Sequence, residues 1–180
     1  SLPGDASIPA IDPRKIDEAR QSGAALMRML EENIRPRDIM TKQAFENAIT
    51  TVVAMGGSTN SVLHLMAIAR ETEVDLHLAD FDRIGRNTPY IADMRPGGKY
   101  VMADLHRHGG VALVAKRLLN AGLLHGDAMT VTGKTLEQNM TAIETIEDQD
   151  IIYQTDSPRS ATGGLAILYG NLAPDGAVIK

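Results

Sequence analysis

AMGGSTNSVLHLMAIA, residues 54–69, contains the signals for the end of one helix and the start of the next. Its adjacent glycines predict the end of one helix, because glycine accepts the left-handed backbone conformation found at helix C-termini. Ser58 or Thr59 can then cap a second helix. That helix is apolar on nearly every side, which is typical of a helix buried all round. His64 is therefore expected to be buried and hydrogen-bonded, although its face also points back toward the glycines, as a substrate contact would.

The same turn is the candidate binding site. Ser58, Thr59 and Asn60 place two hydroxyls and an amide at a helix start, where unpaired N–H groups and the helix dipole favour an anion. A carboxylate or a phosphate would suit it. Ordinary helix capping explains the same residues without any ligand. The turn is not a phosphate-binding P-loop, because the required Gly-Lys-Ser/Thr is missing.

The residues upstream predict an arm and two helices. Residues 1–12 are rich in proline and glycine and indicate an extended arm. Asp12 followed by Pro13 is typical of a helix start, and the apolar residues that follow recur at helical spacing, which predicts one buried stripe. Thr41 is the expected cap of the next helix. The stripe comprises Ile16, Ala19, Gly23, Ala24, Met27, Leu30 and Ile34.

Downstream residues predict a mixture of short elements. Apolar and polar residues alternate over residues 74–78, the period of a short strand, and residues 111–118 predict a helix closed by Gly122. Residues 129–133 are rich in strand-forming types, and Thr135 with Gln138 matches a capping box. LAILY and AVI near the end of the chain are apolar runs joined by GNLAPDG, which predicts a strand, a loop and a strand.

Composition excludes several classes of function. The 180 residues are 43% hydrophobic and 23% charged, which predicts a globular chain of one domain or one domain with the start of another. The absence of cysteine excludes a disulfide scaffold, a thiolate zinc site and a cysteine-held iron–sulfur cluster within this chain. A net charge of −5 and few aromatics argue against nucleic-acid binding, and no apolar run approaches the roughly 18 residues of a membrane span.

Two other clusters could carry chemistry. His106 and His108 would converge on a metal in a strand or loop but diverge on a helix, so a solvated helix end is the favoured interpretation. Asp104 could orient one of these imidazoles. The acidic residues within 144–150 lack the spacing of a calcium loop and are read as a solvated linker.

Four long blocks of this chain resemble consecutive blocks of the dihydroxy-acid dehydratase family, which also includes 6-phosphogluconate and sugar-acid dehydratases. The similarity covers essentially all 180 residues in the family's order, and GGSTNSVLHL with TVTGKTLEQN is most similar to the dihydroxy-acid branch. SLPG at the start resembles the segment after the family's third cluster cysteine. The blocks are AMGGSTNSVLHLMAIA, PGGKYVMADLHRHGGV, LLNAGLLHGDAMTVTGKTLEQN and GGLAILYGNLAPDGAVIK.

The resemblance implies an α/β fold: residues 1–145 would form the helix-rich end of a parallel-sheet domain, and residues 146–180 the first strands of a β-barrel-like domain. It implies a hydro-lyase of branched-chain amino-acid biosynthesis, which removes water from a 2,3-dihydroxy acid to give a 2-keto acid. Its cofactors would be an iron–sulfur cluster and magnesium. Its partners would be the small dihydroxy acid, the remainder of a longer polypeptide and a second subunit of a homodimer, with no nucleic acid or membrane. Its location would be the bacterial cytoplasm, or an organelle in a eukaryote.

The chain departs from the family pattern because it has no cluster cysteine, and TDSPR at 155–159 is not the family's Thr-Asp-Gly-Arg segment. No catalytic or metal residue of the family is therefore assigned, and the chain is expected to be an internal segment, inactive alone. Ser58, Thr59 and Asn60 remain the candidate substrate-binding residues. The alternatives are a segment of a sugar-acid or 6-phosphogluconate dehydratase, and a non-catalytic anion-binding or dimerisation module.

Overall fold

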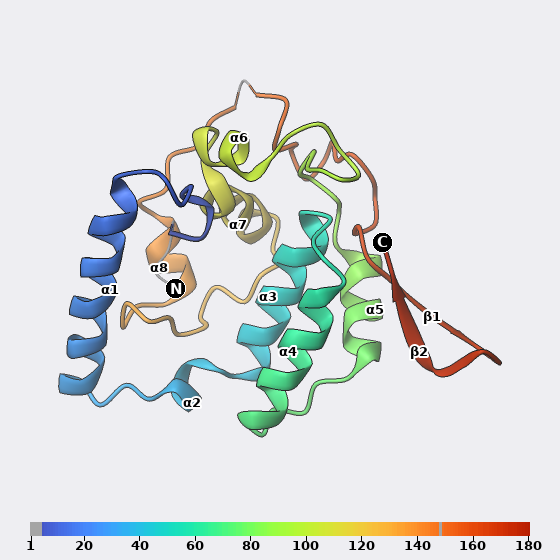
Figure 1. Ribbon diagram of the computed structural model, residues 1–180, viewed down its shortest axis with the longest axis horizontal. Coiled ribbons are helices and arrows are strands. Elements are labelled where there is room, and N and C mark those ends of the chain that lie inside the picture. The colour runs from blue at the N-terminus through green and yellow to red at the C-terminus, as the bar shows by residue number, and fades with distance from the viewer. Residues whose placement is uncertain (1–4, 148) are drawn as a thin grey trace.

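The computed structural model describes residues 5–147 and 149–180 of the chain. Figure 1 shows α1 at one end of the long axis and the β1–β2 hairpin at the other, with α3, α4 and α5 between them. In chain order the elements are η1 (Asp5–Ser7), α1 (Arg14–Glu31), α2 (Pro36–Ile39), α3 (Lys42–Ala54), α4 (Asn60–Glu71), α5 (Leu78–Asn87), α6 (Met102–Arg107), α7 (Gly110–Asn120), α8 (Leu136–Met140), β1 (Ala166–Gly170) and β2 (Ala173–Ile179).

Helix α3 connects two apolar clusters. Its Phe45, Ile49 and Val53 pack with buried residues of α4, α5 and β1 in one cluster. Ala54, at its end, belongs to the second cluster, which is built around α7 and includes Leu113 and other fully buried side chains. Because one helix contributes to both clusters, its C-terminal end and the turn that follows are held from two sides.

Two extended segments lie side by side next to that end of α3. The N–H of Ile91 donates to the carbonyl of Ala54 at 2.8 Å, and the N–H of Tyr153 donates to the carbonyl of Ile91 at 2.7 Å. The N–H of Asp93 donates to the carbonyl of Ile151 at 2.8 Å. Residues 151–153 therefore return across the molecule to pair with residues 91–93, although neither segment forms a named strand.

The predicted strand–loop–strand unit is confirmed as an antiparallel hairpin in which Ile167 lies opposite Val178. The connection is shorter than predicted, because β2 already begins at Ala173 and includes the Pro-Asp-Gly turn signal. Buried Ile167 packs in the same cluster as side chains of α5. Among the described residues the parallel pairing is limited to the isolated bridge between Met94 and Tyr100. The parallel sheet and the barrel thus stay predictions about a longer protein.

Most predicted helix ends are confirmed. The side chain of Thr41 accepts a hydrogen bond from the N–H of Ala44, and Thr135 and Gln138 form a reciprocal capping box. Gly56 and Gly122 have positive φ angles of 60° and 71° just beyond α3 and α7. Local capping chemistry explains these ends.

The predicted burial of α1 is wrong. Ile16 is 61% exposed and Leu30 is 68% exposed, and the buried residue of the helix is Ala25 on another side. Helical spacing had correctly grouped the apolar residues, but burial depends on which face meets a neighbour. The members of the predicted stripe that lie on α1 are all exposed, whereas Ile34 lies beyond the helix and is half-buried. Together with the exposed Leu26 they form the exposed stripe of α1: Ile16, Ala19, Gly23, Ala24, Leu26, Met27 and Leu30.

Other local expectations are also corrected. Helix α4 is not buried all round, because Leu63 is 69% exposed and His64 is exposed. Residues 74–77 form no strand, and Leu78 opens α5 instead. Of the predicted extended arm, residues 1–4 lie outside the described residues, and residues 5–12 form η1 and turns. Residues 129–133 form turns with one bridge, between Met129 and Thr135.

No helix among the described residues is long and apolar enough to span a bilayer.

Candidate functional site

A cleft of about 580 Å³ opens where three segments meet. One wall is the turn from α3 to α4, residues 55–59. The facing wall is the loop at residues 94–96, and the start of α6, residues 100–102, completes the lining together with Lys180. The turn that the sequence singled out therefore does border a cavity large enough for a small organic molecule.

Two of the three predicted site residues lie at this cleft. Ser58 and Thr59 line it, whereas Asn60 is exposed and is not among its lining residues. The N–H of Asn60 donates to Oγ of Ser58 at 3.2 Å, and the N–H groups of Ser61 and Val62 donate to nearby carbonyls at 3.0 and 3.1 Å. The N–H groups of Asn60, Ser61 and Val62, which would otherwise bind an anion, are thus already hydrogen-bonded to atoms of the same turn. Within the described part of the chain, the Thr59 hydroxyl makes no capping hydrogen bond. It therefore stays available to a ligand.

The rest of the lining is mostly apolar with cationic groups. Arg95 is exposed, and its Nε donates to the carbonyl of Lys99 at 3.0 Å. Lys180 adds a second positive charge. Hydroxyls and a guanidinium beside apolar side chains suit a small carboxylic acid with an aliphatic part. The apolar lining residues are Met55, Met94, Pro96, Val101 and Met102.

Among the described residues that line the cleft, none carries a carboxylate or an imidazole that could transfer a proton. Tyr100 donates its phenolic hydrogen to the carboxylate of Asp150, and this bond raises the pKa of Tyr100 to about 12. The phenol therefore stays protonated near neutral pH. None of the residues that line the cleft is an aspartate, a glutamate or a histidine. These side chains can bind and orient a ligand, but they include no carboxylate or imidazole to serve as a general base.

The cofactors implied by the resemblance do not fit the residues of this chain. The chain has no cysteine to hold an iron–sulfur cluster. The described residues also contain no group of three or more His, Asp or Glu side chains arranged to hold a metal ion. Cluster and magnesium ligands would have to come from other residues, so no chemical step is assigned through either group here.

The HRH cluster is a helix end, as the sequence favoured. Nδ1 of His106 lies 3.4 Å from Oγ of Ser7, and its Nε2 lies 2.9 Å from a terminal nitrogen of Arg14. His108 instead contacts the backbone carbonyl of Asp104 through Nδ1 at 2.9 Å. The two imidazoles thus have separate partners, and the Asp104 carboxylate caps α6 instead of orienting either of them.

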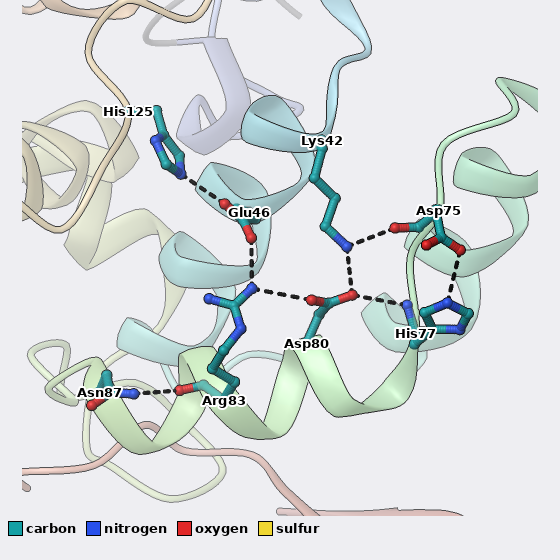
Figure 2. Close-up of polar contacts among 8 residues, drawn as sticks. All are labelled: Lys42, Glu46, Asp75, His77, Asp80, Arg83, Asn87 and His125. Atoms are coloured by element: carbon teal, nitrogen blue, oxygen red, sulfur yellow. Dashed lines mark hydrogen bonds and ion pairs between the residues drawn. The ribbon is translucent and has the colours of Figure 1, made fainter.

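A chain of charged side chains joins α3 and α5 away from the cleft lining (Figure 2). Arg83 donates to Glu46 at 2.6 Å and to Asp80 at 3.1 Å. Lys42 also reaches Asp80, and His125 lies 2.8 Å from the other oxygen of Glu46. Burial opposes ionisation of Glu46, but its hydrogen bonds to Arg83 and His125 outweigh that effect and lower its pKa. Sequence patterns missed this cluster, because its members are far apart along the chain.

Fold and cleft together define a candidate small-molecule-binding segment. Two family models match the chain in succession: the dihydroxy-acid/6-phosphogluconate dehydratase N-terminal model over residues 1–139, and the corresponding C-terminal model over residues 150–180. The chain belongs to the dihydroxy-acid/6-phosphogluconate dehydratase family.

Curated relatives are similar over the full length of the chain. A dihydroxy-acid dehydratase of Clavibacter michiganensis is 55% identical and one of Acidothermus cellulolyticus is 57% identical, each over 100% of this chain and 32% of the relative. A dihydroxy-acid dehydratase of Sulfurisphaera tokodaii is 53% identical with the same coverage. The chain therefore spans about a third of the length of the curated relatives it matches.

Proposed function

We propose that this chain is a segment of a dihydroxy-acid dehydratase, a hydro-lyase that converts a 2,3-dihydroxy acid to a 2-keto acid. The observation that carries the proposal is identity of 53–57% along the whole chain with relatives of that name. The family also takes its name from 6-phosphogluconate dehydratases. The apolar wall of the cleft favours an aliphatic side chain over the polyhydroxylated chain of a sugar acid, because buried hydroxyls without partners are costly.

Within that enzyme we assign the cleft to substrate binding. The hydroxyls of Ser58 and Thr59 and the guanidinium of Arg95 would hold the substrate carboxylate. Met94 and Met102 would contact its aliphatic end. Asn60 is not assigned to this contact, because it lies on the exposed start of α4.

The reaction itself needs groups that this segment does not carry. Loss of water from a 2,3-dihydroxy acid takes the proton from C2 and the hydroxyl from C3, and the resulting enol becomes the 2-keto acid. Hydroxide is a poor leaving group, so the reaction calls for strong electrostatic assistance. We propose that the iron–sulfur cluster, the magnesium ion and the proton-transfer groups are held by residues elsewhere in a longer polypeptide.

The fold and setting proposed for the whole enzyme follow the resemblance. Residues 1–145 would end a parallel-sheet α/β domain, and residues 146–180 would begin a β-barrel-like domain. In support, the boundary lies between the two ranges that the family models match, and both long edges of the two-stranded β1–β2 sheet lack a strand partner among the described residues. We further propose a homodimer in the bacterial cytoplasm that serves branched-chain amino-acid biosynthesis.

The test is a substrate comparison with the complete gene product that contains these residues, reconstituted with iron, sulfide and magnesium. We expect 2-keto acid from a branched aliphatic 2,3-dihydroxy acid, with kcat/KM at least about a hundredfold above that for 6-phosphogluconate. A preference for 6-phosphogluconate would instead identify the protein as a 6-phosphogluconate dehydratase. A lack of turnover with either acid would contradict a dehydratase function.

A further inference from the structure

We propose that Arg159 is a positioning residue that holds the loop forming one wall of the cleft. The loop, residues 93–100, supplies Met94, Arg95 and Pro96 to the lining. Arg159 is distant in sequence and belongs to the range matched by the C-terminal family model. The proposal rests on the substrate-binding role proposed for the cleft, and it adds that the C-terminal part of this chain shapes that site.

Arg159 contacts this loop at two points. One terminal nitrogen pairs with the carboxylate of Asp93, and the other donates to the carbonyl of Gly97. Asp93 is only 4% exposed, so its charge depends on a partner inside the protein. The forked guanidinium can engage a carboxylate and a carbonyl together, whereas the compact ammonium of lysine suits one of them.

Backbone hydrogen bonds give the loop a defined shape between these two contacts. The N–H of Tyr100 donates to the carbonyl of Asp93 at 3.0 Å, and the N–H of Arg95 donates to the carbonyl of Tyr100 at 2.9 Å. The N–H of Gly98 donates to the carbonyl of Met94 at 2.7 Å. Gly98 packs so closely that a side chain there would overlap Asp93 and Arg159. The two contacts of Arg159 thus act on a closed loop, and a shift at either one would move the cleft wall.

Tyr90 lies between Arg159 and the other wall of the cleft, the turn from α3 to α4. The guanidinium carbon of Arg159 lies 5.3 Å from the centre of the Tyr90 ring, close enough for a cation–π contact. The Tyr90 hydroxyl is buried without a hydrogen-bond partner in the described part of the chain. It abuts Gly56 on one side, and a Cβ at Gly97 would lie 3.6 Å from it on the other. Tyr90 therefore acts as a spacer between the two walls, and Arg159 fixes its ring.

The backbone holds Arg159 in place for these contacts. Its own N–H donates to the carbonyl of Tyr90 at 2.9 Å, and the N–H of Tyr90 donates to the carbonyl of Ser160 at 2.9 Å. Main-chain pairing remains when the side chain is changed. Replacing the side chain should therefore loosen the loop without detaching the segment that carries it.

The experiment compares Arg159→Met, Arg159→Lys and wild type in the complete gene product, with Arg86→Met as the matched control. Arg86 is an exposed arginine that pairs with Asp82 at 2.8 Å, outside the cleft lining. Two readouts are taken: hydrogen exchange of the amides of Gly98 and Tyr100, and the separate kcat and KM for the aliphatic 2,3-dihydroxy acid.

For Arg159→Met we expect exchange at the two loop amides to rise at least about tenfold while the amides of α7 stay unchanged. We expect KM to rise about fivefold or more with kcat within about twofold, and Arg159→Lys to fall between Arg159→Met and wild type. Unchanged loop exchange, or faster exchange throughout the chain, would overturn the proposal. If wild type is active and Arg159→Met has the same KM as wild type, the proposal is also overturned. If wild type forms no keto acid, the proposed function fails, and the exchange result alone decides the role of Arg159.

Discussion

Nζ of Lys42 lies 2.6 Å from Oδ2 of Asp80, so the first residue of α3 is paired with the first turn of α5 (Figure 2). The Asp80 side chain is only 15% exposed. It also accepts a hydrogen bond from the N–H of His77 at 3.0 Å, which caps α5. One carboxylate thus closes a helix start and joins two helices of the same apolar cluster.

The ionisation of Asp80 predicts an acid-sensitive contribution to stability. Burial raises its pKa, but hydrogen bonds from Lys42, the His77 N–H and Arg83 outweigh this and lower the pKa to about 2. A depressed pKa in the folded state stabilises the protein above the unfolded value near pH 4, and this is lost as the pH falls toward about 2. Asp80→Asn should therefore cost about 1–2 kcal/mol at pH 7 and much less near pH 2. Chemical unfolding of both proteins across this range measures it, and a pH-independent difference would contradict it.

Asn47 predicts a second stability effect. Its side-chain amide accepts from the N–H of His125 at 2.8 Å and donates to the His125 carbonyl at 3.0 Å, so it fixes the loop after α7 to α3. Asn47→Ala should lower the free energy of unfolding by about 1–3 kcal/mol, because it leaves the His125 N–H without a partner and removes one of the two hydrogen bonds that the His125 carbonyl accepts, the other coming from the Ala128 N–H. The control is Asn87→Ala, which removes one exposed bond to the Arg83 carbonyl. Thermal melting of both variants tests this, and equal shifts would contradict it.

The exposed stripe of α1 predicts self-association of the 180-residue chain. Leu26 is 57% exposed and Leu30 is 68% exposed. Changing both to glutamate should reduce light scattering and hydrophobic-dye binding, because a contiguous apolar surface drives association. The matched control changes the exposed Gln21 and Ser22 to glutamate, which adds the same charge outside the stripe. Scattering that falls equally in both variants would mean that charge, not the stripe, controls association.

Met102 predicts substrate preference. It lines the cleft at the start of α6 and is 43% exposed. Met102→Asn should lower kcat/KM for an aliphatic dihydroxy acid about tenfold, since a lost apolar contact is worth about 1–3 kcal/mol, and should affect a hydroxylated acid less. Parallel kinetics with the two acids on the complete gene product measure the ratio. If the ratio of kcat/KM for the aliphatic acid to kcat/KM for the hydroxylated acid is unchanged, Met102 does not contact the substrate.

Helix ends were predictable from sequence because their chemistry is local. Thr41 and Thr135 act as caps through bonds to residues three positions away, and Gly122 adopts the backbone conformation that glycine favours. Burial was less predictable, since it depends on distant neighbours. The spacing of Ile16 and Leu30 correctly defines one side of α1, but it could not tell which side would face the rest of the molecule.

The site was predictable only in part for the same reason. Ser58 and Thr59 carry a local signal, two hydroxyls after a glycine pair at a helix start. Arg95, Met102 and Arg159 carry none, because the fold alone brings these separate segments to the turn. The false strand at residues 74–78 shows the limit of short patterns, where alternation over a few residues also fits a loop leading into a helix.

Substrate binding by the turn at Ser58 and Thr59 is tested by the KM of the complete gene product for a branched aliphatic 2,3-dihydroxy acid, in wild type and in Ser58→Ala/Thr59→Val. The control is Thr72→Val, whose hydroxyl donates to the Ile68 carbonyl at the end of α4 and does not line the cleft. We predict a KM raised about tenfold or more in the double variant and unchanged in the control, because the lost hydroxyls would hold the substrate carboxylate. An active, folded double variant with the KM of wild type would show that this turn does not bind the substrate.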